Sequence, residues 1–452
     1  MAKVNRIHDR PRRRRSLVVA IVALLAVAAL VVYTPRFIAR HFLAPGSSDE
    51  SRRPPSQLGN DDDSSPTDAE LREQMEAKGY LAGSIPAPKV SGTTVYDAAQ
   101  AYNGFNLSLS GHGFVASLLD MEGQVLHTWR LDNELVYPAP SRRPTARPRF
   151  FERAHLYPNG DLLVIVGEHG IAKLDRDSKL LWILRDPYHH DIDVLDDGLI
   201  YTLVRKFGRI PIRGEEQPTY EDFVCLLDSS GVVLRKISIP RALLDSSYAH
   251  LLEKGANTAD LTHTNSVQYL DGALASVSPL FKKGNVLVSC RTLDAVAIID
   301  LETEQAVWAM AGPWDGQHSV SLLDSGRMLV FDNRGLGARS RVIEFDPFSG
   351  TEFWIYGAKD AESFYSASAG FCERLPNGNT LIVESNSGRA FEVNRDKTIV
   401  WDFTNPYRVG VNSELIAALY DVVRLPPDFP VDWIPPNRDR AVSPNDLGEE
   451  LQ

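Results

Sequence analysis

Three histidines occupy matching positions in the sequence, and together they indicate a ligand site. His190 stands eight residues before Gly198 and His318 eight residues before Gly326, each at the start of an apolar run. His263 opens the similar segment HTNSVQYL. An imidazole can exchange a proton near neutral pH, donate or accept a hydrogen bond, or bind a metal. Three imidazoles at one position of repeated units therefore predict a shared site.

Four further polar residues are expected at the same place. Asn265 follows His263 by two residues, and Arg291 follows the next apolar run. Asn333 ends one apolar run and Arg341 begins the next. In an antiparallel unit the end of one strand and the beginning of the next lie side by side. Imidazole and guanidinium groups would then gather at one opening, which favours an anionic ligand that Arg341 can hold through two oxygens.

Metal binding is the competing chemical interpretation. The same three histidines, with a carboxylate such as Asp191, could ligate iron or zinc. Arg341 and Arg291 would repel a cation, so we expect no metal at the site and no cofactor. The chain contains no G-x-S-x-G sequence and no Gly-rich phosphate loop between a strand and a helix. Serine hydrolase and phosphate-loop chemistry are therefore excluded.

The elements that must position these residues are short strands in a repeated unit. Clear copies are LYPNGDLLVIV at 156–166 and RLPNGNTLIVE at 374–384, each followed by a strand that carries Trp. Trp308, Trp354 and Trp401 are separated by 46 and 47 residues. Alternating apolar residues and PNG, DSG and DDG turns are typical of hairpins. Four-stranded units at about this period are blades, so we predict an all-β, six-bladed β-propeller whose tryptophans pack between blades.

Two segments interrupt this pattern, and both are predicted to be helical. Residues 240–255 have leucines at helical spacing, and residues 412–424, NSELIAALYDVVR, offer Ser413 as an N-cap and Pro426 as a stop. The sixth unit, SLLDMEGQVLHTW, lacks a clear first strand. The three cysteines form no CxxC motif and adjoin apolar runs, which favours buried thiols over a disulfide framework.

The N-terminus predicts a membrane anchor. Residues 1–15 are strongly basic, and residues 17–33 are uninterruptedly apolar, just long enough to span a bilayer. The exit through Thr34-Pro35-Arg36 has no small-residue cleavage site, so we expect an uncleaved signal-anchor with a cytoplasmic N-terminus and a periplasmic or extracytoplasmic propeller. The whole chain has a formal net charge of −11, which argues against nucleic-acid binding.

Composition then divides the chain into five parts. They are a basic tail (1–15), a transmembrane anchor (16–35), a flexible linker rich in Pro, Ser, Asp and Gly (36–94), the propeller (95–425) and a C-terminal tail (426–452).

The motifs resemble those of the arylsulfotransferase family, propeller enzymes that move a sulfuryl group between phenols without a nucleotide donor. The resemblance rests on HTNSVQYL at 263–270, GQHSVSLLDSGRMLVFDN at 316–333, SRVIEFD at 340–346 and the RLPNGNTLIVE strand pair. It implies a six-bladed propeller with several histidines and one arginine around the sulfate. By motif, His263, His318 and Arg341 would hold the anion and transfer protons, with His190, Asn265, Asn333 and Arg291 beside them.

One departure from the family affects the expected chemistry. The family uses a further histidine of a later blade as the sulfuryl acceptor, but no histidine follows His318 in this chain. The corresponding segment, YSASAGFCERLPNG at 365–378, offers hydroxyl groups and Cys372. His318 or His263 could accept the group instead, a serine could do so with help from a histidine, or the protein could bind an anionic or aromatic ligand without turnover.

We therefore expect a membrane-anchored arylsulfotransferase-like protein that acts on, or binds, a small phenolic or sulfated ligand. The alternative is a non-catalytic propeller that serves as a binding or scaffold protein at the membrane. A quinone-dependent dehydrogenase propeller shares the Asp-to-Trp spacing, but such propellers normally have more blades.

Overall fold

The computed structural model describes Gly83 and residues 85–136, 150–167, 169–335, 337, 339–410 and 412–435. The described residues all lie within Ser65–Gln452, the second of the two units into which the chain divides. The predicted anchor and most of the predicted linker lie outside the described residues. Within the described part of the chain, no helix has both the length and the apolar character needed to cross a membrane.

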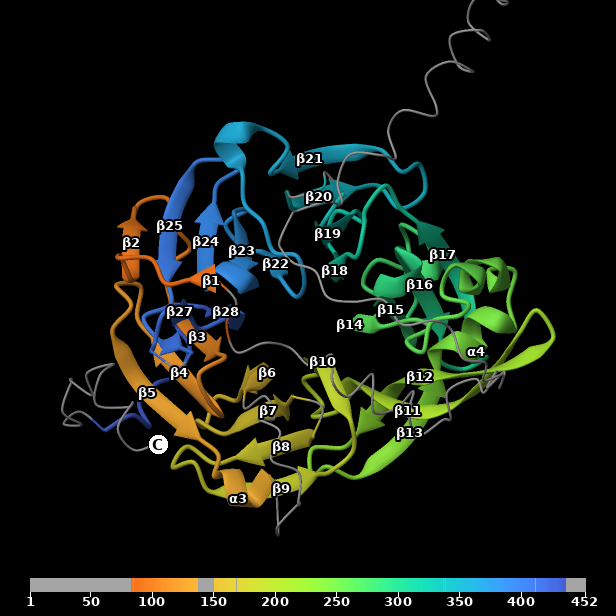
Figure 1. The fold of residues 1–452 in the computed structure, drawn as a ribbon, viewed down its shortest axis with the longest axis horizontal. Helices are drawn as coiled ribbons and strands as arrows, with labels where there is room; N and C mark the ends of the chain where they lie inside the picture. The colour runs from red at the N-terminus through yellow and green to blue at the C-terminus, as the bar shows by residue number, and fades with distance from the viewer. Residues whose placement is uncertain are drawn as a thin grey trace, which may run out of the picture. The chain divides into compact units, whose positions relative to one another are not determined.

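The second unit is built almost entirely from antiparallel sheets arranged around a common centre (Figure 1). Four of them consist of four consecutive strands each. They are β6 (Phe151–Leu156), β7 (Leu162–Val166), β8 (Gly170–Leu174) and β9 (Leu180–Leu184); β10 (Tyr188–Val194), β11 (Ile200–Ile212), β12 (Glu215–Leu227) and β13 (Val233–Ser238); β14 (Thr264–Leu270), β15 (Asn285–Cys290), β16 (Ala295–Asp300) and β17 (Gln305–Ala311); and β18 (His318–Leu322), β19 (Met328–Asp332), β20 (Arg341–Phe345) and β21 (Glu352–Tyr356).

Two further sheets combine strands from both ends of the described chain. In the first, β2 (Gly92–Tyr96) pairs with the outer strand of β22 (Phe371–Arg374), β23 (Thr380–Glu384), β24 (Arg389–Val393) and β25 (Ile399–Thr404). In the second, β28 (Leu419–Leu425) is the inner strand beside β3 (Phe105–Ser110), β4 (Val115–Leu119) and β5 (Val125–Arg130). A small sheet joins β1 (Ile85–Pro86), β27 (Leu415–Ile416) and β26 (Arg408–Val409).

The inner strands bring neighbouring sheets together. Strand β10 contacts β6 and β14, β18 contacts β14 and β22, and β28 contacts β23 and β6. The all-β, propeller-like architecture predicted from the repeat is therefore confirmed for the described residues. A propeller buries both faces of each sheet against its neighbours, and the middle strands β7, β15, β19 and β23 are buried at every position.

The helix predicted over residues 412–424 is wrong. This stretch forms β27 and β28, and β28 pairs with β3 from Leu419↔Ser110 to Leu425↔Phe105. The apolar residues of the stretch fit helical spacing, but strand β3 needs a partner on its inner edge and the pairing outweighs local propensity. This strand is the first strand that the sixth unit lacked in the sequence.

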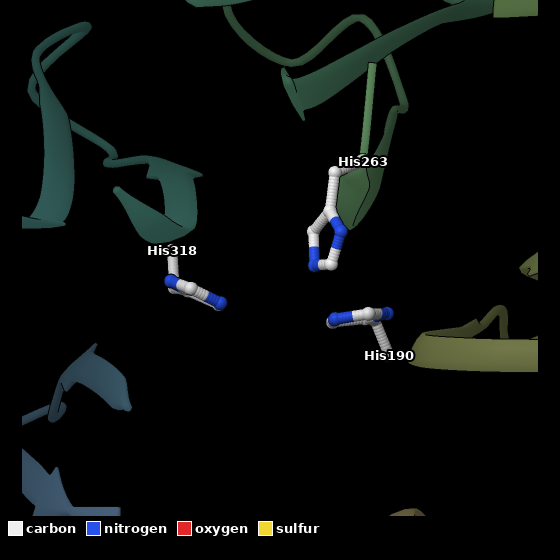
Figure 2. A group of neighbouring side chains, drawn as sticks. All are labelled: His190, His263 and His318. Atoms are coloured by element: carbon white, nitrogen blue, oxygen red, sulfur yellow. The ribbon is translucent and has the colours of Figure 1, made fainter. Parts of the chain in front are cut away.

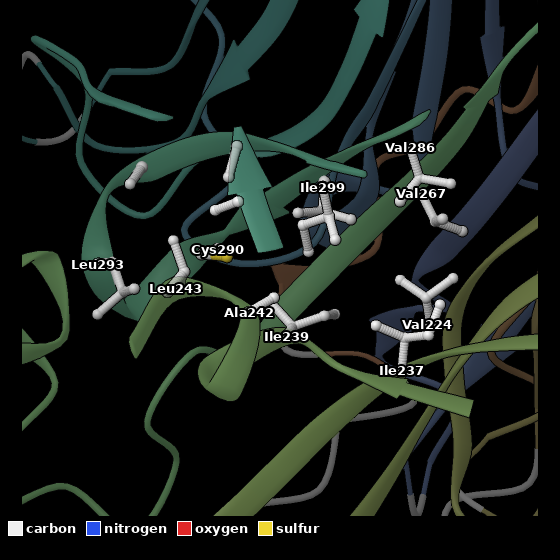
Figure 3. Close-up of a cluster of buried hydrophobic side chains, with 14 of the residues drawn as sticks. Val224, Ile237, Ile239, Ala242, Leu243, Val267, Val286, Cys290, Leu293 and Ile299 are labelled. Carbon is white, nitrogen blue, oxygen red and sulfur yellow. The ribbon is translucent and has the colours of Figure 1, made fainter. Parts of the chain in front are cut away.

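The other predicted helix is present in two short pieces. They are α4 (Ile239–Leu244), which begins at the cap Ser238, and the 3₁₀ helix η1 (Ala249–Lys254). Ile239 and Leu243 pack in one buried cluster with Val267 of β14 and Val286 of β15 (Figure 3). The segment thus fills the core between two sheets. The three cysteines are buried free thiols, as predicted.

Tryptophans in outer strands connect neighbouring sheets, as the repeat predicted. The indole N–H of Trp129 in β5 donates to the Gly160 carbonyl in the turn between β6 and β7, at 3.0 Å. Trp354 in β21 donates to Arg395 O at 3.1 Å, and Trp401 in β25 to Met121 O at 2.9 Å. Each tryptophan therefore holds a turn of the following sheet as well as filling the space between sheets.

A buried ion pair connects β28 to β24. Arg424 Nη1 lies 2.8 Å from Glu392 Oε2, and both side chains are fully buried. Glu392 Oε1 also accepts hydrogen bonds from Asn379 Nδ2 and the Tyr102 backbone N–H. Arg424 Nε donates to Asn106 Oδ1 at 2.7 Å. The pair is therefore embedded in hydrogen bonds that connect β3, β24 and β28.

We predict that Glu392→Ala lowers the free energy of unfolding by about 3–5 kcal/mol, because it leaves the Arg424 guanidinium buried without its partner. The midpoint of urea denaturation measures this loss. Glu253→Ala breaks the exposed pair between Glu253 and Arg213 and should cost less than about 1 kcal/mol. Equal losses in the two variants would contradict a structural role for the buried pair.

Candidate functional site

The three predicted histidines lie where inner strands are irregular. Pairing with the next strand shifts register between His189 and Ile192, between Thr264 and Ser266, and between His318 and Ser321. His190 (φ 63°) and His263 (φ 44°) adopt the left-handed backbone that residues with a side chain rarely take. Bulges of this kind re-aim side chains and are common beside active sites. Here they direct imidazoles toward the centre.

The structure brings the three imidazoles together. One nitrogen from each of His190, His263 and His318 lies within 4.8 Å of the other two. The ring centroid of His190 is 5.0 Å from that of His263 and 6.3 Å from that of His318. Figure 2 shows the three rings pointing toward a common point from three separate elements.

The proton of His318 is placed by its neighbours. Its Nδ1 lies 2.7 Å from Asn333 Oδ1 and 3.0 Å from the Gly316 carbonyl oxygen. The amide of Asn333 is oriented by Nδ2, which donates to the carbonyls of Ser366 and Ala369. Both partners of Nδ1 can only accept, so Nδ1 carries the proton and Nε2 carries the lone pair. Nε2 is buried and has no hydrogen-bond partner among the described residues.

His318 is neutral at physiological pH. Burial and, after it, the nearby Arg291 guanidinium lower the pKa of its imidazole to about 3, although the hydrogen bond that Nδ1 donates to Asn333 opposes the shift. A neutral imidazole with a fixed Nδ1 proton presents Nε2 as a nucleophile, a base or a ligand.

His263 is oriented by a carboxylate. Its Nδ1 lies 2.5 Å from Asp260 Oδ2. Burial alone would raise the pKa of Asp260, but His263, together with Arg205 and His189, outweighs burial and holds the pKa well below its usual range. An ionised carboxylate at Nδ1 fixes the tautomer of the ring and stabilises the imidazolium once it forms. This pair can therefore take up a proton from a ligand.

His190 belongs to a chain of polar contacts. Its Nδ1 lies 2.8 Å from Nδ1 of His189, and His189 Nε2 lies 3.5 Å from Asp222 Oδ1. Burial lowers the pKa of His190 well below its usual value, and the other three rings and Arg205 lower it further. His190 is therefore neutral as well, and its ring faces His263 edge-on.

A cavity of about 330 Å³ lies against this cluster. His190 and His318 line it, and four carboxyl groups line it with them, from Glu152, Asp191, Asp193 and Glu373. Arg153 also lines it, and its guanidinium is bonded to Asp191 at 3.0 Å and to Asp421 at 2.9 Å. Asp191 additionally accepts the Val267 backbone N–H. The volume is sufficient for a small aromatic ligand.

The other residues predicted for the site are only partly brought together. Asn333 contacts His318, and Asn265 lines the cavity, where its Nδ2 donates to Gln317 O. Arg291 is close enough to lower the pKa of His318. Arg341 is not part of the cavity lining; its Nε and Nη2 bind Asp332 Oδ2 at 2.9 and 2.6 Å. Arg341 is therefore paired with a carboxylate, whereas the sequence led us to expect it beside an anionic ligand.

Two cavity residues that we did not predict stand at the same distance before a turn glycine as His190 and His318 do. Glu152 stands eight residues before Gly160, and Gly370 eight residues before Gly378, at the position that His190 and His318 occupy in their sheets. Both line the cavity. Gly370 has a φ of 104°, and a Cβ there would lie 2.6 Å from the Phe331 ring. A histidine could not replace it without local rearrangement.

Glu373 is a further cavity residue that the sequence did not single out. Burial raises the pKa of its carboxyl to about 7, and Asp421 raises it as well, while Arg153 opposes the shift. Near neutral pH this carboxyl can therefore donate or accept a proton inside the cavity. Nothing in the pattern FCERLPNG distinguishes it from an ordinary strand residue.

We predict that Glu373→Gln makes stability less dependent on pH. Because the folded-state pKa lies above the ordinary 4.5, the stabilisation by the protonated carboxyl is complete below about pH 4.5 and is lost as the pH rises through 7. The neutral amide should therefore gain about 1–3 kcal/mol of stability over the wild type between pH 5 and pH 8. Urea denaturation at several pH values measures this.

Glu352, an exposed residue of β21, provides the control. Glu352→Gln should follow the wild type at every pH. A wild-type-like slope in Glu373→Gln would show that the Glu373 carboxyl ionises at an ordinary pH.

Solved structures similar to this one share little sequence with it. A protein of unknown function from Bacteroides caccae is 14% identical, with a TM-score of 0.47 over 71% of this chain and 98% of that chain. The Cps50 (Swd1) β-propeller domain of Myceliophteria thermophila is 13% identical, with a TM-score of 0.41 over 71% and 89%. Virginiamycin B lyase from Staphylococcus aureus is 8% identical, with a TM-score of 0.34 over 56% and 69%.

No curated protein matches the chain. The sequence profile described as Arylsulfotransferase (ASST) matches residues 153–406, a segment that contains all three clustered histidines. Because the match spans more than half of the 452 residues, the chain belongs to the arylsulfotransferase family.

Proposed function

We propose that the protein transfers a sulfuryl group between phenolic compounds in the cavity beside His190 and His318. The observation that carries the proposal is the buried Nε2 lone pair of His318, whose ring is fixed by Asn333 and Gly316. Family membership supports the same reaction class. The first step would be attack of Nε2 on the sulfur of an aryl sulfate. A nitrogen–sulfur bond forms, the ester oxygen–sulfur bond breaks, and the phenolate leaves with the bonding electrons.

His263 would serve as the base of the second step. An acceptor phenol gives its proton to the ring nitrogen of His263 that does not face Asp260, and its oxygen then takes the sulfuryl group from His318. The imidazolium is stabilised by the Asp260 carboxylate and later passes the proton to the released phenolate or to water. Both imidazoles are then restored, so the cycle consumes no cofactor.

The sequence led us to expect that Arg341 binds the equatorial sulfate oxygens, but we assign these oxygens to another group. Because Asp332 neutralises Arg341, we assign Arg341 a positioning role: it holds the end of β19, from which Asn333 reaches His318. The protonated carboxyl of Glu373 is the cavity donor that we propose for the oxygens. Arg291 adds positive charge near His318.

Ligand binding without turnover is the second candidate, and one observation favours it. Gly370 stands at the inner-strand position where other sheets place His190 and His318, and it offers no side chain. A phenolic sulfate would then remain bound unchanged, as in a binding or scaffold protein.

We further propose that the protein is a six-bladed propeller on a single-pass anchor. The six sheets of four or five strands support the blade number. The basic residues 1–15 followed by the apolar residues 17–33 support an anchor with a cytoplasmic N-terminus, which would place the propeller on the periplasmic or extracytoplasmic side.

The reaction is tested with the full-length chain, 4-nitrophenyl sulfate as donor and phenol as acceptor. We expect release of 4-nitrophenol that depends on the acceptor. His318→Ala should lower kcat by at least about 100-fold, because it removes the sulfuryl acceptor, and His263→Ala should lower it by about 100-fold or more, because it removes the base. His250→Ala changes an exposed histidine of η1 and should leave the rate unchanged.

Acceptor-independent release, or full activity in His318→Ala, would contradict the proposed transfer. Absence of turnover in a wild-type protein that 4-nitrophenyl sulfate still stabilises against heat would replace transfer with the binding function.

A further inference from the structure

We propose that His190, His263 and His318 form a binding site for a divalent first-row transition-metal ion, with Zn²⁺ as the representative ligand. This inference goes beyond sulfuryl transfer and does not require it. It rests on where the three rings point, on the groups that hold them, and on the charges around them.

The geometry matches a three-histidine site. The candidate ligand nitrogens lie within 4.8 Å of one another, and Figure 2 shows the rings converging. Zinc–nitrogen bonds of about 2.1 Å place tetrahedral ligands roughly 3.4 Å apart. Each nitrogen therefore needs to move by roughly 1 Å or less, which rotation about the side-chain bonds can supply. Three protein nitrogens leave a fourth position for water or a ligand.

Two of the three rings already make the hydrogen bonds that metal-bound histidines make through their second nitrogen. Asp260 accepts the Nδ1 proton of His263 at 2.5 Å, and the Asn333 amide accepts that of His318 at 2.7 Å. Metal-bound histidines usually donate their second nitrogen to a carboxylate or carbonyl in this way, which fixes the tautomer and the ring orientation. The lone pair of His318 Nε2 is buried without a partner among the described residues.

Two of the guanidinium groups near the cluster are neutralised by carboxylates. The repulsion expected from Arg341 is removed by its bond to Asp332. The cavity lining carries four carboxyl groups and a single guanidinium, that of Arg153, which two aspartates neutralise. Arg291 and Arg205 oppose the binding and set a limit on its strength.

The donor set selects the class of metal. Imidazole nitrogen suits Zn²⁺, Co²⁺, Ni²⁺ and Cu²⁺, whereas Mg²⁺ and Ca²⁺ prefer oxygen ligands. The carboxylate that the sequence suggested as a further ligand, Asp191, is already bonded to Arg153 and to two backbone N–H groups. We therefore expect nitrogen-only protein ligation and no binding of Mg²⁺.

A metal ion and a sulfuryl group would compete for the same lone pair. Metal ligation uses Nε2 of His318, the atom that we assign as sulfuryl acceptor. A bound ion would therefore prevent transfer, and a chelator would restore it. This consequence alone depends on the proposed function, while binding itself does not.

The experiment titrates CoCl₂ into the metal-free full-length chain and records visible absorption, followed by displacement with ZnCl₂ and by calorimetry with ZnCl₂. We expect the visible bands of tetrahedral Co²⁺ ligated by nitrogen, saturation at one ion per chain, loss of the bands on Zn²⁺ addition, and no heat with MgCl₂. Zn²⁺ should also raise the Tm of the wild type.

Two kinds of variant test the ligands. His318→Ala or His263→Ala should weaken binding by more than about 100-fold, and Asp260→Asn by about 10- to 100-fold, because the amide no longer fixes the His263 tautomer. His250→Ala should bind as the wild type does. Circular dichroism at the titration temperature confirms that each variant is folded. If a histidine variant does not fold, Asp260→Asn still tests the site, because it leaves all three histidines in place.

Absence of Co²⁺ bands in the folded wild type, or equal binding in His318→Ala and the wild type, would overturn the metal site. Stoichiometric binding together with no sulfuryl transfer by the metal-free protein would instead reject the proposed reaction and retain the metal site. The two failures are therefore distinguishable.

Discussion

The site depends on one constraint, namely that each sheet must bury both of its faces against neighbouring sheets. The inner strands are thereby forced together, and β14 contacts both β10 and β18. Residues at the start of these strands meet even though more than a hundred positions separate His190 from His318. The bulges and the left-handed backbone at His190 and His263 then turn imidazoles inward. The closing strand β28 and the Arg424–Glu392 pair hold the first and last sheets in the same arrangement.

The repeated four-stranded unit, and the position that His190 and His318 share within it, could be predicted from the sequence because both follow from residue spacing. The PNG and DSG turns mark hairpins, and the position eight residues before the turn glycine identifies His190 and His318 correctly as neighbours. Spacing could not identify β28, since LIAALYDVV fits helical and strand periods alike and only the unpaired edge of β3 decides between them. It also could not reveal which partner a charged group takes, and so Arg341 was expected beside a ligand rather than on Asp332.

The electrostatic character of the centre differs from that of a simple anion site. Buried imidazoles with strongly lowered pKa values are held neutral by burial and by one another. Burial raises the pKa values of three carboxyl groups of the lining, those of Asp191, Asp193 and Glu373, and Asp191 is also bonded to Arg153. Burial thus removes charge from both kinds of group, and the chemistry depends on lone pairs and on shared protons. Asp260 and Asn333 decide which nitrogen offers its lone pair.

The indole hydrogen bonds from Trp129, Trp354 and Trp401 to the turns of following sheets have an evolutionary consequence. They set the spacing between adjacent sheets at the periphery, far from the histidines, so lengthening or shortening a rim turn would widen or narrow the centre without altering any residue that lines it. Descendants of this chain could thereby bind larger or smaller ligands while His190, His263 and His318 stayed unchanged.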